Sequence, residues 1–381
     1  MLLEDICDIY SGYAIKEFNE DKLGIPVIKI SNILKDGTIE LDDCQYTIEK
    51  IDHKYQSQYD DIYIALSGAT TGKIGILKSY DKFIINQRVG IVRKKENNIP
   101  IDFIKYFLFY YTDRILKEAS GCAQPNISPK QIGKYILPRV GINNIKFIVE
   151  ILESLTNIIK KRKEQLNRLD ELIKARFVEM FVDTNDKYEK GLLSNSVKEM
   201  FIGPFGSSLK NEMFVDKEEA FCMVYEQKHA IQKTVDLPAR YVDKKKFNEL
   251  KRFTVMGGDI IVSCRGTIGE IYSLPENSPI GIMHPSIMKI RLKPEKYCNV
   301  FFELMLSKFM KDNIEKNNGS GIKMAITAKD LGKEAFILPP LKKQMQFEEF
   351  VSQVNKSKVE VKRALDEAQL LFDSLMQKYF G

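Results

Sequence analysis

The stretch IVEILESLTNIIKKRKEQLNRLDELIKARFVEM, residues 148–180, predicts one long helix with a single apolar seam. The seam positions alternate in steps of four and three residues, and eight of the ten are apolar: Ile148, Leu152, Leu155, Ile159, Arg162, Leu166, Leu169, Ile173, Arg176 and Met180. Adding 199 to each number gives a second seam, in which nine of ten residues fit: Phe347, Val351, Val354, Lys358, Val361, Leu365, Ala368, Phe372, Leu375 and Tyr379. Because a sustained heptad pattern favours coiled-coil packing, these two helices can supply both strands of one coiled coil.

The segments that precede the two helices repeat as well. Residues 61–74 (DIYIALSGATTGKI) and 259–271 (DIIVSCRGTIGEI) both predict a strand, a Gly-rich turn and an exit strand. Residues 127–134 (ISPKQIGK) correspond to 326–333 (ITAKDLGK), again at an interval of 199, and the segments 6–12 and 197–203 also correspond. A period this long indicates two similar domains and not a solenoid of short repeats.

Each half is expected to hold strands and helices of ordinary length. Runs rich in β-branched residues and bounded by Gly, Asp and Asn predict strands at 27–30, 62–66, 83–85 and 89–92 in the first half and at 260–264 and 287–292 in the second. Helices are expected at 103–119 and 300–317. The fold class is therefore α+β, with a mixed or antiparallel sheet in each half.

Length and composition limit the class of protein. With 381 residues and 44% hydrophobic content, the chain can bury two cores. It has no apolar run long enough to cross a bilayer, and residues 1–5 lack the pattern of a signal peptide, so a cytoplasmic protein is expected. The six scattered cysteines are expected to be reduced thiols. The net charge of +6 is compatible with binding to a polyanion, although evenly scattered charge would give the same sum.

The sequence offers little material for catalysis. Residues 67–74 (SGATTGKI) look at first like a phosphate-binding loop, but only three residues separate Gly68 from Gly72 and Ile74 lacks a magnesium-binding hydroxyl. The three histidines are isolated, which argues against a histidine-based metal or nucleophile site. There is no Asp- or Asn-Pro-Pro-aromatic tetrad of the kind that positions adenine for methyl transfer. The sequence therefore favours binding, with an unrecognised DNA-modifying enzyme and a coiled-coil scaffold with protein-binding ends as alternatives.

The ordered set of motifs resembles the specificity subunits of type I restriction-modification systems. The resemblance covers the whole chain and rests on the two-fold repeat, the strand leading into residues 67–73 (SGATTGK), the turn 203–210 (GPFGSSLK), and residues 337–341 (ILPPL) with Gln344 opening the last helix. Each motif alone is short, but their order, closed twice by a heptad helix, is specific.

The resemblance implies two similar mixed α/β DNA-recognition domains, separated by an antiparallel coiled coil of the two long helices and related by a pseudo-two-fold axis. It places the first target recognition domain at 1–140, the first long helix at 141–185, the second target recognition domain at 186–340 and the second long helix at 341–381. Each domain would read one half of an asymmetric, bipartite site on double-stranded DNA. The helices would set the unread spacer.

The resemblance also implies partners. The chain would be non-catalytic and without a cofactor of its own. It would recruit two modification subunits, which bind S-adenosylmethionine and methylate adenine, and further restriction subunits. Seam residues such as Leu152 and Leu365 are expected to pack the helices on each other, so that partner contacts fall on the outer faces.

One departure from the family pattern lies at the entry to the first helix. The second half has Pro339, Pro340 and Gln344 at this junction, whereas the first half reads PRVGI at 138–142 and loses the second proline and the glutamine. The two junctions are therefore not expected to be fully equivalent.

DNA contacts require hydrogen-bonding groups on exposed turns. Arg88 and Arg265 are the preferred contacts because a guanidinium can bond two acceptors at once. The candidates are Ser11, Tyr13, Lys16, Ser67, Thr70, Thr71, Lys73, Asn86, Gln87 and Arg88 in the first domain, and Ser207, Ser208, Lys210, Gln227, Lys228, Arg265, Thr267, His284, Ser286 and Lys323 in the second.

Overall fold

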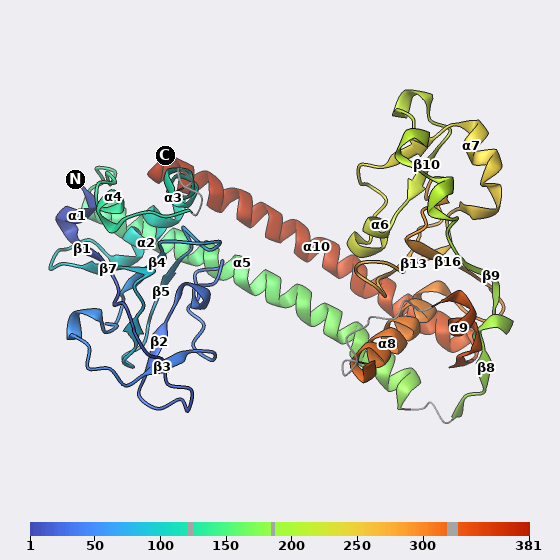
Figure 1. Cartoon of the computed structure of the whole chain (residues 1–381), viewed down its shortest axis with the longest axis horizontal. Coiled ribbons are helices and arrows are strands. Elements are labelled where there is room, and N and C mark those ends of the chain that lie inside the picture. The colour runs from blue at the N-terminus through green and yellow to red at the C-terminus, as the bar shows by residue number, and fades with distance from the viewer. Residues whose placement is uncertain (120–124, 184–186, 318–326) are drawn as a thin grey trace. The chain divides into compact units, whose positions relative to one another are not determined.

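The computed structural model describes residues 1–119, 125–183, 187–317 and 327–381. It divides into two compact units (Figure 1): unit 1 holds residues 1–163 and 362–381, and unit 2 holds residues 164–361. Lys323, one of the candidate DNA contacts, lies outside the described residues, as does Cys122. None of the helices within the described part of the chain is long and apolar enough to cross a membrane.

Unit 1 is built on an antiparallel main sheet and a small mixed sheet. The main sheet has the strand order β1-β7-β4-β5, with β1 at Cys7–Ser11, β4 at Ile62–Ala65, β5 at Ile74–Ile76 and β7 at Val89–Lys94. The small sheet has the order β3-β2-β6, with β2 at Ile25–Ile28, β3 at Gln45–Thr47 and β6 at Ile84–Ile85. Here β2 pairs with β3 antiparallel and with β6 parallel. The expected strands of the first half are thus present, with ends shifted by up to two residues.

Unit 2 repeats this plan. Its main sheet has the order β14-β13-β16-β9, with β9 at Val197–Ile202, β13 at Ile260–Ser263, β14 at Ile271–Ser273 and β16 at Ile287–Leu292. Its small sheet has the order β11-β10-β15-β12, with β10 at Cys222–Tyr225, β11 at Arg240–Val242, β12 at Thr254–Val255 and β15 at Gly281–Met283. Because β10 and β15 are parallel, as β2 and β6 are, the repeat extends to strand direction.

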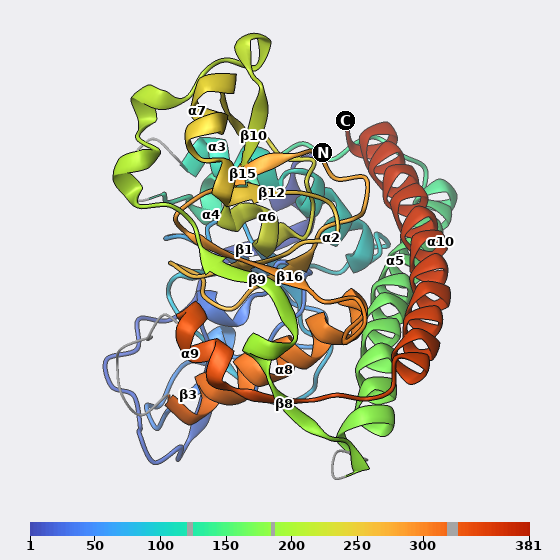
Figure 2. The ribbon, with the colours of Figure 1, turned by 90° about the vertical axis from the view of Figure 1, so that its right-hand side faces the viewer.

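In both units the inner strand β4 or β13 of the main sheet is buried on both faces. Ile62 and Ile64 of β4 pack into the helix-covered core of unit 1, whereas Tyr63, between them, packs toward the small sheet. In unit 2, Ile260 and Val262 face the helices and the intervening residue faces the small sheet. This alternation follows from the two-residue period of a strand. Figure 2 shows the main sheet of unit 2 between the small sheet and helices α8 (Asn299–Asn317) and α9 (Ala328–Lys333).

Helices follow each main sheet, as expected, with one difference. The helix expected at 103–119 is two helices, α2 and α3, which are separated at Tyr111. The Tyr111 amide donates to the carbonyl of Leu108 as well as to that of Phe107, which tightens the last turn and ends α2. The remaining elements are α1 (Leu3–Ile6), α2 (Ile101–Tyr110), α3 (Thr112–Ala119) and α4 (Pro129–Gly133) in unit 1, and β8 (Lys190–Leu192), α6 (Gln227–Gln232), α7 (Lys244–Glu249) and β17 (Ala335–Ile337) in unit 2.

The two long helices are α5 (Ile142–Phe177), which continues as a π-helix to Val182, and α10 (Leu341–Phe380). All twenty seam positions are buried or half-buried. In unit 1 the start of α5 shares a core with the end of α10, where Met376 and Phe380 lie. In unit 2 the end of α5 meets the start of α10, and Lys358 donates to Asp170 at 2.6 Å. The seam therefore packs the helices antiparallel in each unit.

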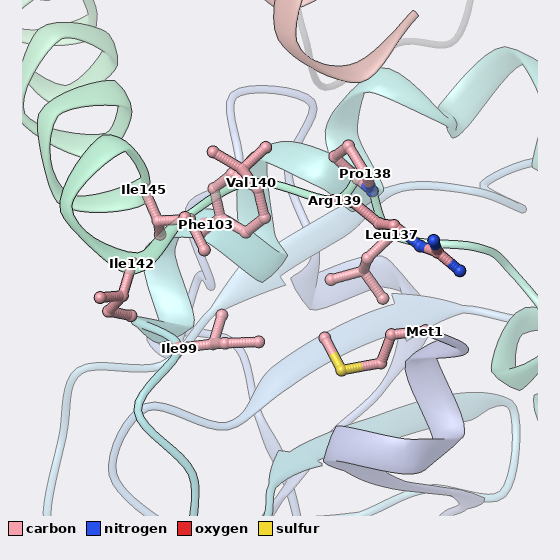
Figure 3. Close-up of a pocket in the computed structure, with 10 residues that line it drawn as sticks. Met1, Ile99, Phe103, Leu137, Pro138, Arg139, Val140, Ile142 and Ile145 are labelled. Carbon is pink, nitrogen blue, oxygen red and sulfur yellow. The ribbon is translucent and has the colours of Figure 1, made fainter.

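The junctions between sheet and long helix differ between the units, as the sequence indicated. In unit 2 the fully buried Gln344 donates to the carbonyls of Lys296 and Pro339 and accepts from the Cys298 amide at 3.0 Å. In unit 1 the apolar Ile145 occupies the position 199 residues earlier. A pocket of about 510 Å³ opens there (Figure 3) and is lined by Met1, Ile99, Phe103, Leu137, Pro138, Arg139, Val140, Gly141, Ile142 and Ile145.

A buried ion pair ties the main sheet together in both units. Arg93 on β7 donates to Asp61 at 2.8 and 2.6 Å, and Arg291 on β16 donates to Asp259 at 2.6 and 2.8 Å. Both aspartates are 1–2% exposed. Burial alone would lower the pKa of Arg93, but hydrogen bonding to Asp61 and its charge raise it. The recurrence of this pair supports the two-domain interpretation at the level of single atoms.

Candidate nucleic-acid interface

In each unit three loops meet where the parallel strands of the small sheet end. In unit 1 the amide of Asn86, just after β6, donates to the carbonyl of Ile28 at 3.0 Å, and the amide of Leu66 donates to that of Arg88 at 2.9 Å. These bonds bring the 86–88 turn next to the end of β2 and to the Gly-rich turn. In unit 2 the amide of His284 donates to the carbonyl of Tyr225 at 2.8 Å and the Cys264 amide donates to that of Ser286 at 2.8 Å.

In each unit a glycine allows the first loop, which follows β1 or β9, to pack against these three loops. The glycines are Gly12 and Gly203. A Cβ atom added to Gly12 would lie 2.2 Å from the carbonyl oxygen of Ile85, and one added to Gly203 would lie 2.2 Å from that of His284. Such distances are too short for any side chain, so only glycine lets the chain pass here. The correspondence of segments 6–12 and 197–203 therefore has a physical basis.

The candidates of the first loop and of the 86–88 turn lie together in unit 1. The amide of Gln87 donates to the carbonyl of Tyr13 at 2.8 Å, and the Asn86 side chain accepts from the Arg88 amide at 3.1 Å. Gln87 and Arg88 are exposed and Asn86 is half-buried. Ser11 pairs with Gly90 at the end of β1 and is half-buried. This turn presents its side chains to solvent while its backbone is held in place.

The Gly-rich turn of unit 1 is held by its own backbone. The amides of Gly68, Thr71, Gly72 and Lys73 donate to carbonyls of the chain, and the turn leads into strand β5 and not into a helix. A phosphate-binding loop needs such amides free, so this geometry differs from one. Thr71 is buried and its hydroxyl donates to the Gly68 carbonyl at 2.7 Å.

The other candidates near this turn differ in their surroundings. Ser67 forms a bridge with Asn126 and is half-buried. Thr70 and Lys73 are half-buried too, and the Thr70 hydroxyl oxygen is buried without a hydrogen-bond partner among the described residues. Lys16 is exposed, and its amide donates to Glu49 at 2.8 Å.

In unit 2 the Gly-rich turn meets the end of β10. A Cβ atom added to Gly266 would lie closest to the side-chain amide of Gln227, at 3.5 Å from its Nε2. The Gln227 Oε1 is buried without a hydrogen-bond partner among the described residues. Gly266 has φ of +67°, which favours glycine, and it is flanked by the exposed Arg265 and Thr267. The candidates Gln227, Arg265 and Thr267 are thus neighbours in space although 38 or more residues separate Gln227 from the turn.

His284 and Ser286 form a hydrogen-bonded pair in the same cluster. The His284 Nδ1 and the Ser286 Oγ are 2.8 Å apart, and Ser286 is buried. Burial lowers the pKa of His284, and the charges of Arg240 and Arg265 lower it further, whereas Glu226 acts in the opposite direction. Burial and the two arginines, which come from β11 and from the Gly-rich turn, therefore favour the neutral form of His284.

The remaining candidates of unit 2 lie on helix α6 and on the segment that follows β9. Lys228 is 3.0 Å from Glu226 and donates to the carbonyl of Pro238. Ser207 and Lys210 are exposed and Ser208 is half-buried, on the loop that leads to Phe214. Lys210 lies 3.9 Å from Glu212.

The structure adds polar residues that the sequence did not single out. Glu226 and Arg240 form an ion pair in unit 2, and Lys29 donates to Gln45 at 2.7 Å in unit 1. In each pair the residues are 14 to 16 apart in the chain and on different strands or strand ends. Only strand register brings them together, and no short sequence motif encodes it.

Comparison with known proteins identifies the family. The model of the type I restriction modification DNA specificity domain matches residues 1–168 and 209–368. The chain is 23% identical over 360 residues to a putative type I restriction enzyme MjaX specificity subunit of Methanocaldococcus jannaschii, covering 90% of this chain and 83% of that protein. It is 22% identical over 410 residues to the type I restriction enzyme EcoBI specificity subunit of Escherichia coli, covering 99% and 84%.

Solved structures share the fold. The S subunit of a type I restriction-modification system from M. genitalium matches with a TM-score of 0.50 at 15% identity, covering 100% of this chain and 95% of that one. A chain from a structure on complex assembly and conformational transition of the type I R-M system matches with a TM-score of 0.57 at 14% identity, covering 100% and 96%. The chain therefore belongs to the family of type I restriction-modification DNA specificity domains and carries two copies of the domain.

Proposed function

We propose that the loop cluster of each unit reads one half of a bipartite, asymmetric DNA site. Family membership makes the chain the DNA sequence-specificity subunit of a type I system. The observation that carries the proposal is that the two units hold the same three loops on the same scaffold but present different side chains. Asn86 stands in unit 1 where His284 stands in unit 2. Different groups on equivalent loops read different bases, which makes the site asymmetric.

We assign different roles to the candidates according to their exposure. Arg88 and Arg265 are exposed at the turns and are suited to contact base edges or phosphates. Thr71 and Ser286 are buried and bonded within the protein, so they hold their loops in shape. We also propose that residues 1–140 and 186–340 form the two target recognition domains and that residues 141–185 and 341–381 form the long helices.

The experiment compares genome-wide adenine methylation in cells that express this chain with its cognate modification subunit. The wild-type chain is expected to direct methylation to one split motif. Arg88→Ala is expected to relax base preference in one half of the motif and Arg265→Ala in the other, because each arginine belongs to a different unit. A motif that does not depend on the chain would overturn the proposed function. Arginine variants with an unchanged motif would remove those residues from the interface.

We further propose that two modification subunits dock on the outer faces of the long helices, with restriction subunits joining the complex, and that the helices set the spacer. In unit 1 a groove on this surface is lined by Phe147, Glu150, Ile151, Ser154, Leu155 and Leu371. Phe147 is 56% exposed and Leu371 is 51% exposed, and because both line this groove they offer an apolar contact surface.

Docking is tested by co-purification of the modification subunit with the full-length chain. Phe147→Glu and Leu371→Glu are expected to reduce co-purification strongly, since a charge would be buried at an apolar contact. Tyr80→Glu is the matched control, because Tyr80 is 86% exposed on a loop of unit 1 outside the helices. Unchanged co-purification of both helix variants would move the docking surface elsewhere.

We propose that the chain itself is non-catalytic and acts in the cytoplasm. The specificity subunits among its relatives support the first part. The cysteines among the described residues are free thiols, as expected in a reducing compartment. Turnover of DNA or of S-adenosylmethionine by the purified chain alone would contradict the non-catalytic role.

A further inference from the structure

Strand register reveals an equivalent pair of polar residues in the two small sheets. In unit 1, Gln45 of β3 lies opposite Val27 of β2. In unit 2, Arg240 of β11 lies opposite Val224 of β10. Val27 and Val224 are equivalent because each also pairs in parallel with the next strand of its small sheet, Val27 with Ile84 of β6 and Val224 with Ile282 of β15. Gln45 and Arg240 therefore occupy the same position of the fold.

The partners of these residues are also equivalent. Lys29 is two residues after Val27, and Glu226 is two residues after Val224. In unit 1 the Lys29 ammonium donates to the Gln45 Oε1 at 2.7 Å. In unit 2 the Arg240 guanidinium donates to Glu226. The same cross-strand bond is thus made by a Lys and Gln pair in one unit and by a Glu and Arg pair in the other.

A phenylalanine lies beneath the cation in both units. Phe18 and Phe214 are equivalent because the residue after each forms a bridge to the equivalent strand of its unit. Asn19 pairs with Tyr46 of β3, and Val215 pairs with Tyr241 of β11. The Lys29 ammonium lies 5.3 Å from the centre of the Phe18 ring. The Arg240 guanidinium lies 4.2 Å from that of Phe214. The cation lies just after β2 in unit 1 and on β11 in unit 2, and in both units it lies over the phenylalanine ring.

The position is part of the loop cluster assigned to DNA. Lys29 directly follows Ile28, whose carbonyl accepts from Asn86, and Glu226 directly follows Tyr225, whose carbonyl accepts from His284. The Arg240 side chain is 34% exposed, so its guanidinium is held on one side and open on another. An arginine fixed by a carboxylate and an aromatic ring loses little rotamer freedom on binding, which favours selective contact.

We propose that this aromatic and cation subsite determines base specificity in each domain, with Arg240 reading guanine in one half-site and Lys29 reading the equivalent position of the other. The inference rests on the DNA-reading role proposed above and deepens it. Both Glu226 oxygens are engaged, one by Arg240 and one by Lys228. The Arg240 Nη1 also donates to Asn211 at 3.5 Å, so the groups that Arg240 presents beyond these contacts are N–H donors only. A forked donor matches the N7 and O6 acceptors that guanine presents together in the major groove.

The test uses the full chain with its cognate modification subunit and measures methylation across all single-base variants of the wild-type site. Arg240→Lys keeps the charge but loses the fork, and Arg240→Ala loses both. Each is expected to lower discrimination for guanine at one position of one half-site by about 5- to 150-fold and to leave the other half-site unchanged. Arg252→Lys and Arg252→Ala are the controls, because Arg252 is exposed over the Phe201 ring at 5.5 Å and outside the loop cluster.

A second variant tests the equivalence of the two units. Glu226→Lys with Arg240→Gln builds the unit 1 pair into unit 2 and is expected to change the base preferred at that position. Equal loss of methylation at all sequences for Arg240→Ala would show a phosphate contact and overturn the proposal, as would a double variant that keeps the wild-type base. The wild-type chain distinguishes the two possible failures. If it directs methylation to a split motif, the proposed function holds and only the role of Arg240 is overturned; if it directs none, the proposed function itself fails.

Discussion

The main sheets of the two units carry the same ion pair between Asp and Arg. It joins Asp61 to Arg93 in unit 1 and Asp259 to Arg291 in unit 2. The loops at the other end of the same sheets carry different residues, with Asn86 in one and His284 in the other. The contrast shows which positions packing constrains. A buried charge must keep its partner, whereas a half-buried turn residue such as Asn86 or His284 differs between the two units.

The two ion pairs differ in the second acidic residue near the arginine, because Arg291 also lies near Glu199. Removing the aspartate should therefore affect the two units differently. Asp61→Ala leaves Arg93 with the backbone carbonyls of Lys54 and Gln56 as its described hydrogen-bond acceptors, beside the Tyr10 ring at 5.9 Å. Because the charge is then buried without a carboxylate, we expect a loss of about 3–5 kcal/mol in the stability of unit 1. Asp259→Ala leaves Arg291 with Glu199 at 3.4 Å, so the loss in unit 2 should be smaller, about 1.5–3 kcal/mol.

Hydrogen exchange of the main-sheet amides in the full chain measures both losses and assigns each to its unit. Asp312→Ala is the control, since Asp312 and Lys308 form a half-exposed pair on α8 that should contribute at most about 0.5 kcal/mol. Equal losses in the two units would mean that Glu199 does not compensate for Asp259.

The junctions give a second, smaller contrast. Gln344→Ala would leave the Cys298 amide and the Lys296 and Pro339 carbonyls without their side-chain partner, at a cost of about 1–3 kcal/mol. The exchange rates of amides in the first turns of α10 are expected to rise. Gln353→Ala, at an exposed position on the same helix, should leave them unchanged. If both variants behave alike, the glutamine does not hold the junction.

The long helices, the main strands and the repeat could be predicted from sequence because each has a local period. The seam Ile148 to Met180 shows its spacing in a single pass along the chain, and burial confirms it. The pair of Glu226 with Arg240 has no such signal, because it depends on the register of β10 and β11. The sequence also could not separate Thr71, which is buried, from the exposed Arg88, since both lie in polar turns.

The smallest expected effect is a loss of folding stability at acid pH. Unit 2 holds His229, which is fully buried, and burial lowers its pKa below the ordinary value of 6.5. Its Nδ1 accepts from the Glu226 amide at 2.9 Å, so a second proton would displace that bond. As the pH falls below about 6.5, the unfolded chain takes up a proton before the folded one does, and stability is lost until the lowered pKa is reached.

Urea unfolding followed by circular dichroism at pH 7.5 and pH 5.5 measures this loss. We expect His229→Asn to be less stable than the wild type at pH 7.5 but to lose less stability on acidification, because the asparagine does not titrate. His53→Asn is the matched control in unit 1, where His53 is exposed and bonded only to Gln56 among the described contacts. Equal acid sensitivity of the wild type and His229→Asn would place the titrating group elsewhere, with His284 as the next residue to change because burial lowers its pKa too.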